Sequence, residues 1–138
     1  MTITHPFNRR IPSFSLTELL IAMAIIGILI LIALPNLMPL ISDAKSTEAK
    51  MQLKHVQTLQ QRYFYVHSKY TADLQAIGFE QEKLTTEGGN ANYVIEIVEA
   101  SASSFKARAT AVVDFDQDGT FNVWEINNEQ KLEETVKD

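Results

Sequence analysis

An uncharged apolar run, Leu19–Leu34, with the sequence LLIAMAIIGILILIAL, is the strongest constraint on this chain of 138 residues. In the wider range Phe14–Ile41 the only charged residue is Glu18. About 20 apolar residues cross a bilayer as a helix, whereas a cleavable secretory signal has an apolar core of roughly 7–15 residues. The run therefore predicts a helix that spans a membrane.

Two basic residues set the expected orientation of this helix. Arg9 and Arg10 lie shortly before the apolar run, and basic residues concentrate on the cytoplasmic side of membrane helices. We therefore expect a single-pass protein with residues 1–13 in the cytoplasm and the rest of the chain outside.

Three residues within the apolar segment break local rules. Glu18 places a carboxylate in a hydrophobic helix, either at the depth of the lipid headgroups or in search of a positive partner on another subunit. Gly27 weakens a helix interior, and Pro35 removes a backbone donor and clashes with the preceding turn. The stretch between them is consistent with an ordinary kinked transmembrane helix or with a segment that melts.

After Pro39 the pattern becomes that of an amphipathic helix. Apolar residues recur at steps of three and four, while lysines, Arg62 and glutamines occupy the other face. A helix from about Phe14 to Ser68 would be on the order of 80 Å long, too long for so small a head to bury. Such a helix is tolerable only in lipid or among copies of itself, which predicts polymerisation. The apolar stripe consists of Ala49, Leu53, Val56, Leu59, Tyr63, Val66 and Tyr70.

The rest of the chain has the pattern of a small antiparallel sheet. Alternation predicts strands over residues 93–98 and 105–113, a third strand over 120–126 and a short fourth strand over 132–136. Residues 80–92 are expected to form a surface loop. The alanine-rich face of the second strand predicts a close approach of the long helix. The expected fold class is α+β, with a long N-terminal helix, hydrophobic then amphipathic, packed on three to four strands.

An acidic loop separates the second and third predicted strands. Asp114, Asp116 and Asp118 alternate along it, Gly119 permits a sharp turn, and Glu125 completes the D-x-D-x-D-G-x5-E spacing of a calcium loop. Alternating carboxylates repel one another unless a cation neutralises them. The alternative is an acidic hairpin turn whose aspartates face water. We expect no required cofactor, with Ca²⁺ as the candidate ligand of Asp114, Asp116, Asp118, Thr120 and Glu125.

Composition narrows the classes of function. The net charge of -5 predicts no overall attraction to nucleic acid. The chain has no cysteine, which excludes a disulfide, a thiolate metal site and a cysteine nucleophile. It contains no H-E-x-x-H, no glycine-rich phosphate loop and no G-x-S-x-G, so we expect no enzymatic activity.

The segment PSFSLTELLIAMAIIGILILIALP, with the arginines before it, resembles the N-terminal signature of type IV prepilins and the related pseudopilins. The resemblance covers about residues 9–35. It implies that a prepilin peptidase removes a leader by cutting between Ser13 and Phe14, and that the new amine of Phe14 is then methylated. It also implies that Glu18 neutralises this amine on a neighbouring subunit during assembly, and that the segment from Gly27 to Pro35 loses helicity in the filament.

One position departs from that signature. The family normally has glycine before the cut, where this chain has Ser13, which leaves open slower cleavage or a different processing arrangement. A later segment, DFDQDGTFNVWEINNEQKL, resembles the C-terminal strand region of cysteine-free pilins and favours a pilus subunit.

The resemblance also implies how the whole chain is organised. Residues 1–13 would be the prepilin leader, 14–41 the transmembrane and assembly helix, 42–69 the amphipathic half of the helix, and 70–138 the globular β-rich head. The subunit would lie in the lipid of the bacterial inner membrane until inner-membrane assembly machinery transfers it to a helical homopolymer. That polymer would be an extracellular pilus at the cell surface.

Other functions fit parts of the same pattern. A minor pilin and a pseudopilin of a type II secretion system would carry the same N-terminal signature. A membrane-anchored calcium-binding module is the alternative of another class. It explains the apolar helix and the acidic loop but leaves Glu18 and the surrounding sequence FSLTEL unexplained.

Overall fold

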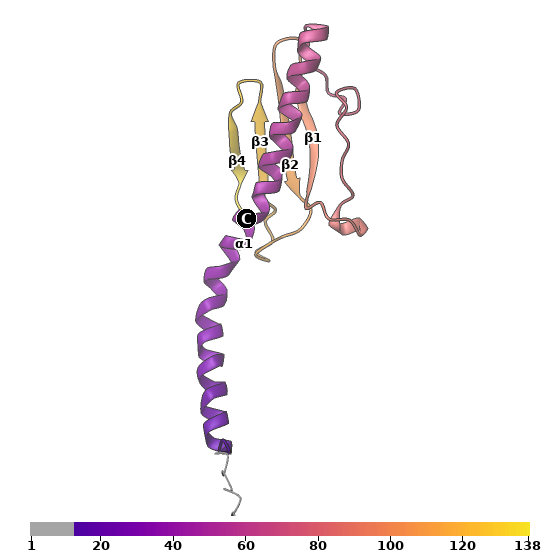
Figure 1. The fold of residues 1–138 in the computed structure, drawn as a ribbon. Coiled ribbons are helices and arrows are strands. Elements are labelled where there is room, and N and C mark those ends of the chain that lie inside the picture. Colours follow the sequence, from indigo (N-terminus) through magenta and orange to yellow (C-terminus); the bar gives the residue numbers. More distant parts are fainter. Residues whose placement is uncertain (1–12) are drawn as a thin grey trace, which may run out of the picture. The chain divides into compact units, whose positions relative to one another are not determined.

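The computed structural model describes residues 13–138 and has one long helix followed by a small sheet (Figure 1). The predicted helix, the four predicted strands and the α+β fold class are confirmed. Of the predicted leader, residues 1–12 lie outside the described residues. The elements are the helix α1 (Leu16–His67), a short 3-10 helix η1 (Thr85–Glu87), and the strands β1 (Tyr93–Ala100), β2 (Phe105–Ala111), β3 (Val123–Asn127) and β4 (Leu132–Val136).

The chain divides into two units, and the division falls within α1. The first unit ends at Pro35, and the second, called the C-terminal unit below, is Asn36–Asp138. The C-terminal unit therefore combines the amphipathic part of α1 with the sheet and its loops.

The four strands form one antiparallel sheet in the order β1-β2-β3-β4. Each strand pairs with the next one in the sequence, and the longest connection, residues 112–122 between β2 and β3, contains the acidic loop. Ile95 lies opposite Ala109, which in turn lies opposite Trp124. Residues directly opposite one another share a face of the sheet, so Trp124 lies on the same face as the buried Ile95 and Ala109.

The structure shortens two of the predicted strands at the acidic loop. β2 ends at Ala111 instead of residue 113, and β3 begins at Val123 instead of residue 120. Thr120, the predicted first residue of the third strand, donates its backbone N–H to Oδ1 of Asp118 at 2.7 Å and so belongs to the loop. Local turn chemistry therefore prevails over the alternating pattern at this end of the sheet.

The core lies between the C-terminal unit's part of α1 and one face of the sheet, which this helix crosses (Figure 1). Ala107 and Ala109 of β2 are completely buried and belong to this core, while the predicted close approach of the helix to their strand stays a prediction. The core residues of α1 are Ala49, Leu53, Val56 and Leu59, and those of the sheet are Tyr93, Ile95, Phe105, Ala107, Ala109, Ala111 and Ile126.

A buried side-chain amide holds the chain where it leaves α1. Gln60 is fully buried, and its Nε2 donates to the carbonyl of Thr71 at 2.6 Å. The backbone N–H of Thr71 donates to Oε1 of Gln60 at 3.3 Å. Both polar atoms of the amide are thus satisfied inside the core, which removes the cost of burying them.

Candidate functional site

The first candidate site is the start of α1, where the sequence predicts cleavage and assembly. Ser13, Phe14 and Ser15 precede the helix, and Phe14 is 88% exposed. The predicted scissile bond between Ser13 and Phe14 therefore lies in a non-helical, accessible segment. Cleavage there and methylation of Phe14 stay predictions.

Ser15 and Glu18 close the beginning of α1 with reciprocal hydrogen bonds. Ser15 donates its backbone N–H to Oε2 of Glu18 at 2.7 Å, and Glu18 donates its backbone N–H to Oγ of Ser15 at 3.2 Å. This arrangement is a capping box, which satisfies two N–H groups at a helix N-terminus. Our sequence interpretation missed it, although the S-x-x-E spacing is the signal that would have revealed it.

The apolar part of α1 presents its side chains to the surroundings. The stretch Leu16–Pro35 is long and apolar enough to cross a membrane, and none of it is buried inside the structure. Gly27 and Pro35 both lie within the helix, and a Cβ at Gly27 would meet no atom within 4 Å apart from its chain neighbours and the adjacent helix backbone. The predicted loss of helicity between these two residues on assembly stays a prediction.

The second candidate site is the acidic loop between β2 and β3. Its aspartates fold the loop by accepting backbone N–H groups: Asp114 accepts from Gln117 at 2.6 Å and from Gly119 at 2.8 Å. Asp116 accepts from Asp118 in the same manner at 3.0 Å. Gly119 has a φ of 91°, a conformation that favours glycine, so the predicted sharp turn at this residue is confirmed.

A residue distant in sequence joins the loop. One carboxylate oxygen from each of Asp114, Asp116 and Asp138 lies within 4.8 Å of the others. The buried Asp138 carboxylate accepts the backbone N–H groups of Phe115 at 3.0 Å and Asp116 at 3.2 Å. Sequence reasoning missed Asp138, because no spacing rule links it to the loop.

The same carboxylates influence the protonation of Asp116. Desolvation, together with the negative charges of Asp118 and Asp138, raises the pKa of the Asp116 carboxyl group. Three oxygens at this separation repel one another and can coordinate a divalent cation through oxygen ligands. The group is therefore chemically suited to a hard cation such as Ca²⁺.

The structure does not bring the whole predicted ligand set together. Asp118 and Glu125 are outside the group of three carboxylates, and the predicted role of Thr120 stays a prediction. Glu125 lies on β3, where its carboxylate pairs with Arg108 at 2.7 Å and with Lys106 at 3.9 Å. The linear calcium-loop spacing is not realised as a single cluster, because the strand directs Glu125 to cations on β2.

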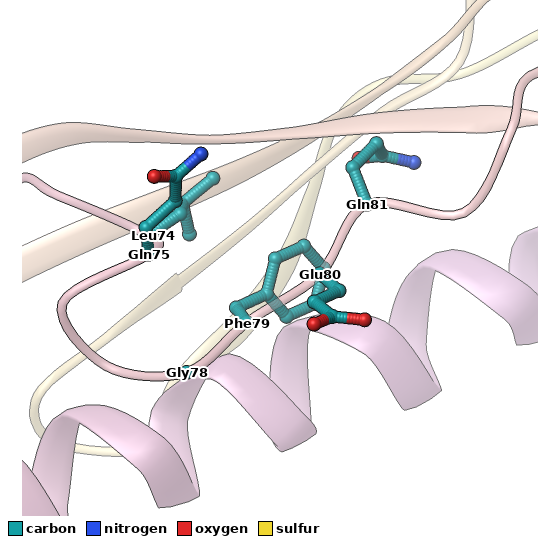
Figure 2. Close-up of a pocket in the computed structure, with 6 residues that line it drawn as sticks. All are labelled: Leu74, Gln75, Gly78, Phe79, Glu80 and Gln81. Atoms are coloured by element: carbon teal, nitrogen blue, oxygen red, sulfur yellow. The ribbon is translucent and has the colours of Figure 1, made fainter.

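A pocket of about 550 Å³ lies along the loop between α1 and β1 (Figure 2). It offers the carboxylate of Glu80 and the amides of Gln75 and Gln81. The Gln81 amide is already engaged with β1, because its Nε2 donates to the carbonyl of Tyr93 at 3.1 Å and its Oε1 accepts the N–H of Ile95 at 2.9 Å. These groups contain no nucleophile beside a base, so the pocket does not suggest catalysis.

Family models match two successive parts of this chain, the N-terminal apolar helix and the region that follows it. Residues 9–34 match a model described as the prokaryotic N-terminal methylation motif. Residues 35–121 match a family model described as "Type IV minor pilin ComP, DNA uptake sequence receptor". Together the two matches cover the apolar helix, the amphipathic helix and the acidic loop.

Two relatives carry the word pilin or pilus in their names. The chain is 42% identical over 77 residues to "Type IV major pilin protein PilA" of Myxococcus xanthus, a match that covers 56% of this chain and 35% of that protein. It is 33% identical over 97 residues to "Type IV wide pilus major component PilA4" of Thermus thermophilus, a match that covers 70% of this chain and 71% of that protein. The match thus spans only about a third of the Myxococcus relative, but most of the Thermus relative. With its methylation motif, its long apolar helix and its helix-backed antiparallel sheet, the chain belongs to the type IV pilin family.

Proposed function

We propose that this chain is a structural subunit of a type IV pilus filament, which polymerises through the segment Phe14–Ile41. The observation that carries the proposal is the exposed apolar surface of α1 with a single carboxylate, Glu18, at its start. An apolar surface of this size is tolerable only in lipid or against other apolar surfaces. The subunit therefore resides in the inner membrane before assembly and in the filament afterwards.

Transfer from lipid to filament needs a specific driving force. Lipid tails are as apolar as leucine, so moving the helix from lipid to sister helices gains little from the hydrophobic effect. A carboxylate in that environment is costly until it meets an opposite charge. In the proposed mechanism, Glu18 pairs with the Phe14 amine of a neighbouring subunit, and helix packing then excludes lipid.

The transfer of the subunit from the membrane to the filament requires two kinds of partner protein. A prepilin peptidase cuts between Ser13 and Phe14, and inner-membrane assembly machinery extracts the processed subunit. In the mature chain the capping box of Ser15 lies immediately after the new amine of Phe14. When such helices pack closely, the Phe14 amine of one subunit must lie beside Glu18 of its neighbour, which defines the axial offset between the two helices.

Microscopy and N-terminal sequencing test the proposal directly. Filaments sheared from cells, imaged by negative stain, should consist mainly of this chain and begin with N-methylated Phe14. Glu18→Ala should leave the protein in membranes without filaments, whereas Asp43→Ala, which removes an exposed carboxylate of α1 outside this segment, should not change filament yield. Normal filament yield from Glu18→Ala would reject the pairing role. Trace incorporation of the wild-type chain would favour a minor pilin or a pseudopilin instead.

We also propose Ca²⁺ as a ligand of the acidic loop, with Asp114, Asp116 and Asp138 as the protein ligands. Oxygen-only ligation by carboxylates is what this ion prefers, and the three oxygens already converge. The ion would replace carboxylate repulsion with attraction and tie the loop to Asp138. The melting experiment given in the Discussion tests this assignment.

The words "DNA uptake sequence receptor" describe the matching family model, and we propose no such role for this chain. Nucleic-acid binding depends largely on neutralising phosphates with lysine and arginine. The chain has a net charge of -5, and its region 70–138 carries fourteen acidic and five basic residues. These charges favour a protein partner over a phosphate polymer.

A further inference from the structure

The charges of this chain are separated along its sequence. Residues 36–69 carry five basic and two acidic side chains, whereas residues 70–138 carry five basic and fourteen acidic ones. From Ala49 to Lys69 there is no acidic residue at all. The C-terminal unit therefore joins a basic helix to an acidic β-rich region.

Two basic side chains of α1, those of Lys54 and Arg62, lie on the face opposite the core. Core residues such as Leu53 and Val56 occupy one side of the helix, and exposed residues at steps of three and four occupy the other. We call these exposed residues the outer stripe: Met51, Lys54, Thr58, Arg62 and Tyr65.

Three of the five residues of the outer stripe are of types that are common at protein contact surfaces. Met51 is 64% exposed and Tyr65 is 79% exposed, and they flank Lys54 and Arg62. Methionine, tyrosine and arginine are enriched at protein interfaces relative to the rest of the surface. Beside the stripe, Nζ of Lys50 lies 4.3 Å from the centre of the Trp124 ring. The stripe thus combines cations with large exposed side chains that water solvates poorly.

Ion pairs within the chain do not use the cations of the outer stripe. Among residues 13–138, the ion pairs join cations of β2 and of the turn before β4 to glutamates of β1, β3 and β4, and none includes Lys54 or Arg62. Pairing within one copy therefore leaves a basic helix face and an excess of carboxylates elsewhere. The pairs are Lys106–Glu125, Arg108–Glu96, Arg108–Glu125 and Lys131–Glu133.

We propose that the outer stripe is a contact surface for a second copy of this chain, with Lys54 and Arg62 facing carboxylates of residues 70–138 in that neighbour. The inference rests on the proposed function, because a filament brings copies into repeated contact. The two surfaces are different patches of one molecule, and a contact between unlike patches forms an open helical filament whenever its rotation does not close into a ring. Charge complementarity would set the register of the heads, while the apolar helices supply the main packing.

Chemical coupling in isotope-mixed filaments tests the contact. Filaments grown from light and heavy subunits are treated with a carbodiimide, which joins a lysine amine to a carboxylate in direct contact, and the products are identified by mass spectrometry. Coupling of Lys131 to Glu133, 2.7 Å apart in one copy, serves as the internal control and should give same-isotope products. Lys54 should give mixed-isotope products with carboxylates of residues 70–138. Absence of these products while the control couples would overturn the inference.

Charge reversal supplies a second, independent measurement. The double variant Lys54→Glu/Arg62→Glu should lower filament yield by about tenfold or more, because it places like charges against the acidic neighbour. The matched control Lys83→Glu/Lys137→Glu changes the net charge equally at exposed positions outside α1 and should assemble normally. Equal yields from both double variants would contradict the contact. Equal melting temperatures in detergent would show that both variants fold.

Two further outcomes distinguish a failure of this inference from a failure of the proposed function. If the wild-type chain forms no filaments, the proposed function fails, whereas filaments in which Lys54 reacts with an acylating reagent as freely as in dispersed subunits overturn this inference alone. Protection of Lys54 by a duplex DNA, with no protection in filaments, would assign the stripe to nucleic acid and reject the contact between copies.

Discussion

The hydroxyl group of Tyr93 donates a 2.8 Å hydrogen bond to Oδ1 of Asn122, and both residues are completely buried. Nδ2 of Asn122 in turn donates to Oε1 of Glu134 at 2.7 Å and to the carbonyl of Val136 at 3.2 Å. Asn122 therefore connects the first strand of the sheet to the last one, at the end that carries the acidic loop.

Tyr93→Phe should destabilise the C-terminal unit. The substitution removes the donor and leaves Oδ1 of Asn122 buried without a partner, which costs about 1–2 kcal/mol and lowers the melting temperature by roughly 5–10 °C. Thermal unfolding of the full chain in detergent, followed by circular dichroism, measures the change. Tyr65→Phe is the matched control, since Tyr65 is 79% exposed and should melt with the wild type. Equal melting temperatures for all three proteins would contradict a stabilising role for the bond.

Stability should fall in alkaline solution because of Tyr93. Burial, followed by the negative charges of Glu48, Asp138 and Glu134, raises the pKa of this phenol above its usual range. The folded state thus keeps the proton that the unfolded state releases near pH 10, so the contribution of Tyr93 is complete below that pH and is lost as the pH rises further. Melting curves between pH 8 and about pH 11 should show this decline. The decline should be weaker in Tyr93→Phe, and an identical slope in both proteins would assign it to other groups.

Glu48→Ala should also weaken the attachment of α1 to the sheet. Oε1 of Glu48 accepts the backbone N–H of Asn92 at 2.8 Å, and its Oε2 accepts from Nδ2 of the same residue at 2.7 Å. Hydrogen bonds to a charged acceptor contribute about 1.5–3 kcal/mol, so the variant should unfold at clearly lower denaturant concentration. Glu80→Ala, at an exposed loop position, is the control. Unfolding midpoints that agree between the two variants would show that the Glu48 contact contributes nothing.

Calcium should stabilise the protein through the acidic loop. A ligand that binds the folded state alone raises the melting temperature, so the wild type should melt several degrees higher with Ca²⁺ than with chelator. Asp116→Asn keeps an oxygen that can accept the Asp118 N–H but removes a charge from the carboxylate group, and it should abolish this difference. Asp73→Asn, whose Oδ1 accepts from Gln75 in a different loop, should respond like the wild type. A wild-type melting temperature that is the same in both solutions would eliminate the metal proposal.

Much of the fold could be predicted because its signals are local. The apolar run and the three-and-four spacing after it determine α1 to within about two residues at each end, and alternation places all four strands. The turn at Gly119 also follows from local chemistry, since φ is positive there. Predictions were less accurate at the acidic loop, where aspartate side chains bind backbone groups and shorten β2 and β3.

Of the two candidate sites, the one at the start of α1 could be predicted from the sequence and the one at the acidic loop could be predicted only in part. The motif around Phe14 and Glu18 could be read directly from the sequence, and its S-x-x-E spacing contains the capping box as well. The group of three carboxylates at the loop could not be predicted, because Glu125 pairs with Arg108 on the neighbouring strand and Asp138 comes from a part of the chain distant in sequence.

The sequence by itself determined that this chain has one long apolar helix, an amphipathic continuation and a small sheet, since hydrophobic length and periodicity are properties of consecutive residues. Only the tertiary structure decided which polar groups meet: Tyr93 with Asn122, Glu48 with Asn92, and Asp138 with the acidic loop. Those contacts join residues distant in sequence, and they depend on the register of the strands and on where α1 crosses the sheet. No local pattern encodes that register, because it results from packing the whole core at once.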